Sequence, residues 1–151
     1  MQKIIVSDTS CLILLDKIGE LSLLNKLFGS IITTPEVASE FGKPLPEWIT
    51  IQKATNKDLQ TIMESKVDKG EASAITLAME MPDCVLIIDE IKGRRIAENL
   101  GLNITGTIGI LIQANNAGIG ISLKSILEKI KKTNFRISEN LERLIRNEIP
   151  E

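Results

Sequence analysis

Short runs of β-branched and aliphatic residues alternate along the chain with longer stretches in which apolar residues recur every three or four positions. Runs of the first kind are typical of buried strands, and stretches of the second kind are typical of helices. The pattern predicts strands at 3–8, 30–34, 84–89 and 102–105, with a further short strand at 49–54. It predicts helices at 10–28 with a break at Gly19, 35–41, 56–67, 69–81, 90–100, 106–117, 122–133 and 138–149.

The alternation of short strands with helices predicts an α/β fold. Strands that are apolar throughout are typical of a parallel sheet covered by helices on both faces. A chain of 151 residues is long enough for one domain with its own core. We therefore expect a single domain over 1–151 with three layers, α/β/α, around a central parallel sheet. Asn56, Ser122 and Ser138 are expected to cap helices, and Leu59, Ile62 and Met63 to face inward.

Two of the predicted strands end in an aspartate. Asp8 follows the run "KIIVS", and Asp89 follows "CVLII". In open parallel sheets, ligands bind beyond the carboxyl ends of the strands, so the two aspartates would meet if their strands were neighbours. Glu90 follows Asp89 directly, and the sequence does not decide which of the two faces the site. Each aspartate would also serve as an ordinary helix N-cap.

Two glutamates lie close to apolar helix faces. Glu71 shares a face with Ile75 and Ala78, while Glu40 follows Val37 and precedes Phe41. Glu36 is the weaker alternative to Glu40. Buried carboxylates that gather without a partner are costly, and a divalent cation reverses that cost. Oxygen ligands of this kind suit Mg²⁺ or Mn²⁺, although a helix start or a solvated surface also explains each glutamate alone.

Composition narrows the chemistry further. The chain has no histidine, which excludes Ser-His-Asp and Cys-His nucleophiles and the common zinc sites. Cys11 and Cys84 lie in apolar stretches, and we expect both to be buried, reduced thiols. No signal peptide and no run of membrane-spanning length is visible, so we expect a cytoplasmic protein without membrane contact.

Charge is unevenly distributed along the chain. Residues 1–90 carry eight Lys or Arg and 14 Asp or Glu, a net −6, whereas residues 91–151 carry ten and six, a net +4. An ordinary mosaic surface and a polyanion held near an acidic metal site both fit this pattern. Two basic groups follow the last strand aspartate: Lys92, Arg94 and Arg95, and then Lys124, Lys129, Lys131, Lys132 and Arg136. The second group also fits the solvated face of an amphipathic helix.

At these residues the chain resembles a PIN domain, in particular a prokaryotic PIN-like subfamily often paired with small antitoxin proteins. The matching stretches are "IVSDTSCLILLDKIGELSLLNKLFG", "ITTPEVASEFG", "GEASAITLAME", "LIIDEIKGRRIAENLGL", "TGTIGIL" and "FRISENLERLI". They keep their order over almost the whole chain. Many PIN domains carry Asp where this chain has Glu71, a departure that affects the geometry of a metal site more than its identity.

The resemblance implies a metal-dependent ribonuclease that hydrolyses RNA phosphodiester bonds with one or two Mg²⁺ or Mn²⁺ ions. Its catalytic, metal-binding acids would be Asp8, Glu40, Glu71 and Asp89, with Glu90 as a further candidate ligand. The residues expected to contact nucleic acid are Ser10, Lys92, Arg94, Arg95 and Thr107. The resemblance also implies a small antitoxin partner and a homodimer.

Two other functions fit the sequence. The first is a catalytically degenerate PIN-like module that binds RNA or protein. The second is a phosphotransfer or receiver domain, since "DTS" at 8–10 distantly resembles the motif of haloacid dehalogenase-like phosphatases. Those enzymes usually carry a second Asp where this chain has Ser10.

Overall fold

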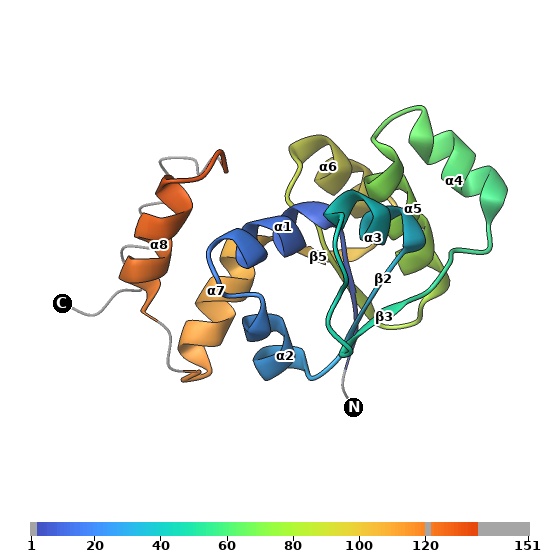
Figure 1. Cartoon of the computed structure of the whole chain (residues 1–151). Coiled ribbons are helices and arrows are strands. Elements are labelled where there is room, and N and C mark those ends of the chain that lie inside the picture. The colour runs from blue at the N-terminus through green and yellow to red at the C-terminus, as the bar shows by residue number, and fades with distance from the viewer. Residues whose placement is uncertain (1–2, 120–121, 136–151) are drawn as a thin grey trace.

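The structure, a computed structural model, describes residues 3–119 and 122–135. Its centre is a five-stranded sheet in the order β3-β2-β1-β4-β5, with every neighbouring pair parallel. The strands are β1 (Ile4–Ser7), β2 (Ile31–Thr33), β3 (Ile49–Ile51), β4 (Cys84–Ile87) and β5 (Asn103–Thr105). The predicted central parallel sheet is confirmed (Figure 1).

Helices cover both faces of this sheet. They are α1 (Thr9–Lys17), α2 (Ser22–Phe28), α3 (Pro35–Phe41), α4 (Lys57–Glu64), α5 (Lys69–Glu80), α6 (Ile91–Asn99), α7 (Thr107–Asn116) and α8 (Leu123–Lys131). One core joins the sheet to α1, α2, α3, α7 and α8, and a second core joins it to α4, α5 and α6. The predicted three-layer α/β/α architecture is therefore confirmed.

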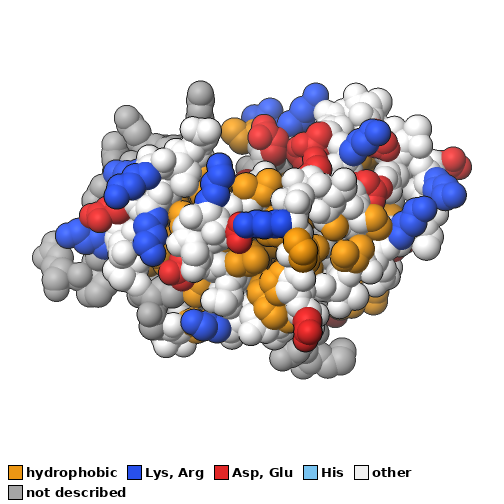
Figure 2. Space-filling model, in the orientation of Figure 1, with side chains coloured by type: hydrophobic (Ala, Val, Ile, Leu, Met, Phe, Trp, Pro, Cys, Tyr) orange, Lys and Arg blue, Asp and Glu red, His pale blue; other side chains and the backbone are white. Residues whose placement is uncertain are grey.

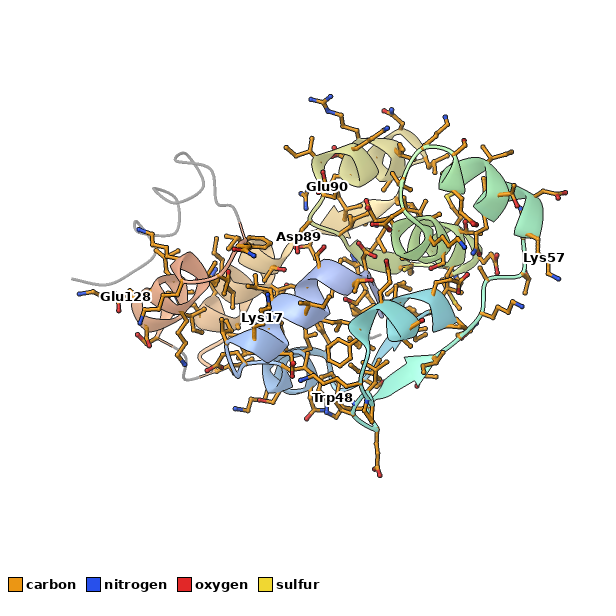
Figure 3. The ribbon with its side chains drawn as sticks, turned by 45° about the horizontal axis from the view of Figure 1, so that its top comes forward. Lys17, Trp48, Lys57, Asp89, Glu90 and Glu128 are labelled. Carbon is orange, nitrogen blue, oxygen red and sulfur yellow. The ribbon has the colours of Figure 1, made fainter. Side chains whose placement is uncertain are left out.

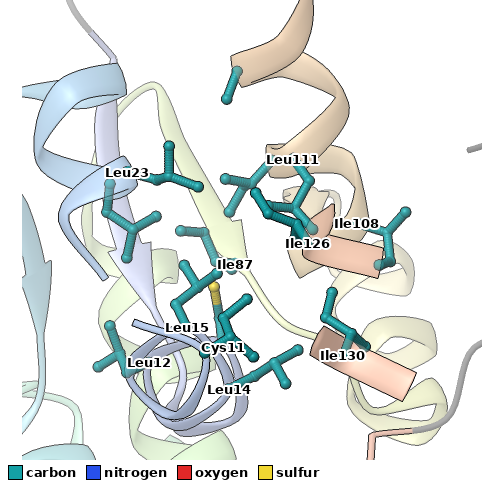
Figure 4. Packing of buried hydrophobic residues seen from close by; sticks show 14 of the residues in the cluster. Cys11, Leu12, Leu14, Leu15, Leu23, Ile87, Ile108, Leu111, Ile126 and Ile130 are labelled. Atoms are coloured by element: carbon teal, nitrogen blue, oxygen red, sulfur yellow. The ribbon is translucent and has the colours of Figure 1, made fainter. Parts of the chain in front are cut away.

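Successive residues of the central strands belong to different cores. Ile5 and Ile87 pack into the first core, whereas Val6 and Leu86 pack into the second. This alternation follows from the two-residue repeat of a strand, and it explains why a strand covered on both faces is apolar throughout. In the first core Ile87 lies among Leu15, Leu111 and Ile126 (Figure 4). Cys11 and Cys84 are both buried thiols without a disulfide, as expected.

Helix ends largely follow the sequence signals. The side chain of Asn56 accepts a hydrogen bond from Leu59 N at 3.0 Å, and that of Ser122 accepts one from Ser125 N at 3.2 Å. The expectation for Ile62 is wrong, since 54% of this residue is exposed. Helix α4 is amphipathic but ends at Glu64, one turn before the predicted end, and its inward stripe is centred on Met63.

Three predictions, Ser138 as a cap, the helix at 138–149 and Arg136 in the basic group, lie outside the described residues. Over the described parts, no helix combines the length and the apolar character needed to cross a bilayer.

Candidate metal centre

Asp8 and Asp89 follow the carboxyl ends of β1 and β4 and lie at the same edge of the sheet. This edge is here called the rim. The two strands are adjacent and in register, with Ser7 opposite Ile87, and Asp8 N donates a hydrogen bond to Ile87 O at 2.9 Å. The expectation that these two strands are neighbours is confirmed. In Figure 3, Asp89 and Glu90 lie next to each other above α1, and in Figure 2 acidic side chains gather at this upper edge.

Asp8 does not act as a helix cap. It occupies the N-cap position of α1, yet its side chain makes no capping hydrogen bond. Only 3% of the residue is exposed, and its Oδ1 atom is buried without a hydrogen-bond partner. A buried oxygen of a carboxyl group that lacks a donor is costly. Helix capping therefore does not account for the buried Oδ1 atom of Asp8.

Glu71 lies on the buried face of α5, as its helical spacing predicts. The residue is 7% exposed, and its Oε2 atom is also buried without a hydrogen-bond partner. The oxygen lies against Gly93 of α6, where an added Cβ would approach it to 2.5 Å. Glu71 is not needed to cap its helix, because Asp68 accepts the hydrogen bond from Glu71 N at 2.8 Å.

Glu40 reaches the rim from the last turn of α3. The residue is exposed, but its Oε1 atom accepts a hydrogen bond from Thr9 Oγ1 at 2.7 Å. A Cβ added at Gly70 would overlap this oxygen, so the missing side chain at that position leaves room for the Glu40 carboxylate. Glu36, the weaker candidate, instead accepts a hydrogen bond from Gln60 of α4.

Asp89 is held by the start of α7. Its Oδ1 accepts a hydrogen bond from Thr107 N at 2.7 Å, and its Oδ2 accepts one from Thr107 Oγ1 at 2.6 Å. Thr107 is fully buried, so in this structure it orients Asp89 instead of presenting a hydroxyl to a ligand. Glu90 is exposed at the N-cap of α6 and makes no capping bond.

Burial and repulsion by nearby acids raise the pKa of Asp8 and of Glu71. Burial raises the pKa of Asp8 to about 7, and the charges of Asp68, Glu40 and Asp89 add to this effect, against a hydrogen bond from the Thr9 backbone. Burial likewise raises the pKa of Glu71 to about 8, with further increases from Asp68, Asp8 and Glu90. Burial also raises the pKa of Asp89, although Thr107 and Arg94 oppose it. The acids are therefore close enough for their charges to interact.

The donor set fits a hard divalent cation, although it is not fully assembled. Among residues 3–119 and 122–135, no three Asp, Glu or Cys side chains are placed to hold one ion together. In this structure Asp89 accepts hydrogen bonds from Thr107, and Glu40 accepts one from Thr9. The two unpartnered oxygens, on Asp8 and Glu71, nevertheless offer the oxygen ligands that Mg²⁺ and Mn²⁺ prefer.

Sequence reasoning missed one acid at this rim. The charge of Asp68 raises the pKa of both Asp8 and Glu71, and its side chain caps α5. Its position three residues before Glu71 is the ordinary signature of a helix N-cap. That signal marks the helix start but does not reveal that the helix starts at the site.

The predicted nucleic-acid contacts differ in how accessible they are. Lys92 and Arg95 are exposed on α6, and Ser10 is exposed on the first turn of α1. Arg94 is half-buried, and its Nη1 atom donates to Ile88 O at 2.8 Å. Arg94 is thus fixed beside Asp89, while the other three are free to meet a ligand that approaches the rim.

The raised pKa values predict how stability varies with pH in metal-free buffer. Because the folded pKa values of Asp8 and Glu71, about 7 and about 8, exceed those of the unfolded chain, the native state holds more protons between about pH 4 and pH 8. Stability should be full below this window and fall as the pH rises through it. We expect the melting temperature in EDTA to drop on the order of 10 °C from pH 5.5 to pH 8. A melting temperature that stays flat or rises over that range would contradict the raised pKa values of Asp8 and Glu71.

Comparison with known proteins adds one positive result. A family described as "PIN domain" matches residues 4–151. No curated protein matches the chain. The family match includes every acid and every accessible basic residue described above.

Proposed function

The chain belongs to the PIN-domain family, whose members are generally nucleases, and from this premise we propose that it is a metal-dependent endoribonuclease. The observation that supports this proposal most strongly is the pair of buried, unpartnered carboxyl oxygens, Asp8 Oδ1 and Glu71 Oε2. Both belong to groups whose pKa is raised by burial and by nearby acids. A bound cation removes both costs at once.

The proposed ligands are Asp8 and Glu71, joined by Asp89 and Glu40, with Glu90 as the alternative to Asp89. One or two Mg²⁺ or Mn²⁺ ions fit these oxygen ligands. When bound, such an ion supplies an activated water and stabilises negative charge on phosphate. No histidine base is needed, which agrees with a chain that has none.

The remaining rim residues have supporting roles in this proposal. Lys92 and Arg95 neutralise substrate phosphates as they approach α6. Arg94 and Thr107 fix Asp89, the first through its charge and the second through two hydrogen bonds. Ser10, two residues after Asp8, offers an exposed hydroxyl on the first turn of α1.

The biological setting is proposed from the sequence resemblance. We propose that the protein acts in the cytoplasm as the toxin of a toxin–antitoxin pair, with a small antitoxin protein and a second copy of the chain as partners. The apolar helices in 11–28 give no independent support for a dimer, since α1 and α2 place Leu12, Leu15, Leu23 and Leu24 in the protein's own core.

A second candidate is a PIN-like module that binds RNA or protein without catalysis. The observation in its favour is the pair of hydrogen bonds from Thr107 that occupy both oxygens of Asp89. In that case Asp89 would serve the fold, and the rim would bind metal weakly or not at all. The two functions differ in their response to Mn²⁺.

The proposed function is tested by RNA cleavage with the full chain. A labelled single-stranded RNA should be cut in the presence of Mn²⁺ or Mg²⁺. An excess of EDTA should stop the reaction, because the acids of the rim cannot activate water without the ion. Gel analysis of the products is the measurement. Intact RNA at millimolar Mn²⁺, together with an unchanged melting temperature, would support the non-catalytic module instead.

A further inference from the structure

One hollow lies beside the metal centre, and two others lie along α1. The first, of about 470 Å³, adjoins the metal centre and is lined by Asp89, Arg94, Gly106 and Phe135, among others. The second, of about 190 Å³, includes Ser10, Leu14, Lys17, Asn134 and Phe135. The third, of about 560 Å³, is lined by Lys17, Ile18, Lys129, Lys132, Thr133 and Asn134. Phe135 lines the first two hollows, and Lys17 and Asn134 line the last two, so neighbouring hollows share a wall; the three together are here called the α1 groove.

The far end of the α1 groove is positively charged. Lys17, Lys129 and Lys132 line its last hollow, and the described residues that line the second and third hollows include no Asp or Glu. Lys129 lies 3.8 Å from Glu20, whereas neither Lys17 nor Lys132 forms an ion pair within the described part of the chain. In Figure 2, Lys and Arg side chains lie over α8 and its border with the rest of the molecule.

The groove leads directly away from the acids of the rim. Asp8 precedes α1, and Lys17 is the last of the nine residues of this helix, so the two ends lie about 14 Å apart along the helix axis. In Figure 3, Lys17 lies on the side of α1 toward α8, whereas Asp89 lies above the helix. A polyanion that has one phosphate at the rim would therefore reach Lys17 and Lys132 within a few nucleotides.

We propose that the α1 groove binds the single-stranded RNA that flanks the cleaved bond, with Lys17 and Lys132 as its phosphate contacts. This proposal rests on the proposed nuclease function and extends it from the metal centre to the substrate path. Single-stranded RNA suits the path, because its unstacked bases can enter small hollows while its backbone meets the lysines. An acidic protein segment is the competing ligand, since it shares the negative charge but not the regular phosphates.

The test compares charge-reversed lysines in a binding assay that involves no cleavage. The full chain in EDTA is titrated into a fluorescein-labelled oligouridylate, and anisotropy gives the affinity as a function of salt. The double variant K17E/K132E should weaken binding by about 10-fold or more and lower the slope of log affinity against log salt by about 1.4, which corresponds to two lost phosphate contacts. Lys124→Glu is the matched control, because Lys124 is exposed on α8 but lines neither the second nor the third hollow.

The outcomes separate the RNA path from the nuclease assignment. If K17E/K132E binds the oligouridylate as the wild type does, the RNA path is overturned, even when the wild type cuts RNA in Mn²⁺. If the reversal removes binding of polyglutamate but leaves RNA binding intact, the groove belongs to an acidic protein, which also overturns it. If the lysines control RNA binding while the wild type cuts no RNA in Mn²⁺, the path is supported and only the nuclease assignment fails.

Discussion

Replacing Asp8 with asparagine is expected to reduce Mn²⁺-dependent RNA cleavage by about 100- to 1,000-fold while the protein stays folded. Asn keeps the size of the side chain but removes the negative charge that would bind the cation. The fold should tolerate the change, because Asp8 makes no capping bond and its Oδ1 has no hydrogen-bond partner. Initial cleavage rates of a labelled RNA, with circular dichroism as the check on folding, measure this effect.

The same variant has a second signature that a merely structural residue would not give. Because burial raises the pKa of Asp8 to about 7, ionisation of this group destabilises the metal-free protein at pH 8. Asp8→Asn should therefore melt at a higher temperature than the wild type in EDTA at that pH. Asp58→Asn is the matched control, since Asp58 is exposed at the start of α4 and should change neither property. Undiminished cleavage by Asp8→Asn would refute the role of Asp8 as a metal ligand.

Saturating Mn²⁺ is expected to raise the melting temperature of the wild type by about 5–10 °C at pH 8. A ligand at about 100 times its dissociation constant stabilises the native state by about 2.7 kcal/mol, and a domain of this size converts that energy into a shift of the stated order. The gain should be larger at pH 8 than at pH 5.5. Asp8 and Glu71, with pKa values of about 7 and about 8, are protonated at the lower pH and must lose their protons to bind metal.

Glu71→Gln supplies the variant for this measurement. It keeps the buried side chain and removes the charge, so the shift with Mn²⁺ should largely disappear. Glu98→Gln, an exposed residue of α6, should retain it. An equal shift in all three proteins would place the metal elsewhere, and no shift in the wild type would favour the non-catalytic module.

The sequence predicted the rim well where the signal was local. A strand that ends in Asp is visible at Asp8 and at Asp89, and the helical spacing of Glu71 with Ile75 and Ala78 indicated a buried carboxylate, which the structure confirms. The parallel sheet followed from the alternation of elements. The pairing of β1 with β4 was a hypothesis, because no local pattern specifies which strands are neighbours.

Other features depend on contacts that a linear pattern does not contain. The bond between Thr107 and Asp89 joins residues 18 positions apart, and the bond between Thr9 and Glu40 joins residues 31 positions apart. Gly70 and Gly93 read as ordinary helix glycines, although each leaves room for a carboxylate from another element. Ile62 shows the opposite case, an apolar residue at helical spacing that remains more than half exposed.

A crystal soaked in Mn²⁺ tests most directly whether the rim acids share a cation. We expect an anomalous density peak that contacts Asp8 Oδ1 and Glu71 Oε2, with the carboxylates of Asp89 and Glu40 turned toward it. A rim without such a peak at millimolar Mn²⁺, in which Asp8 and Glu71 satisfy their oxygens with donors from the protein, would contradict the metal centre and the nuclease chemistry built on it.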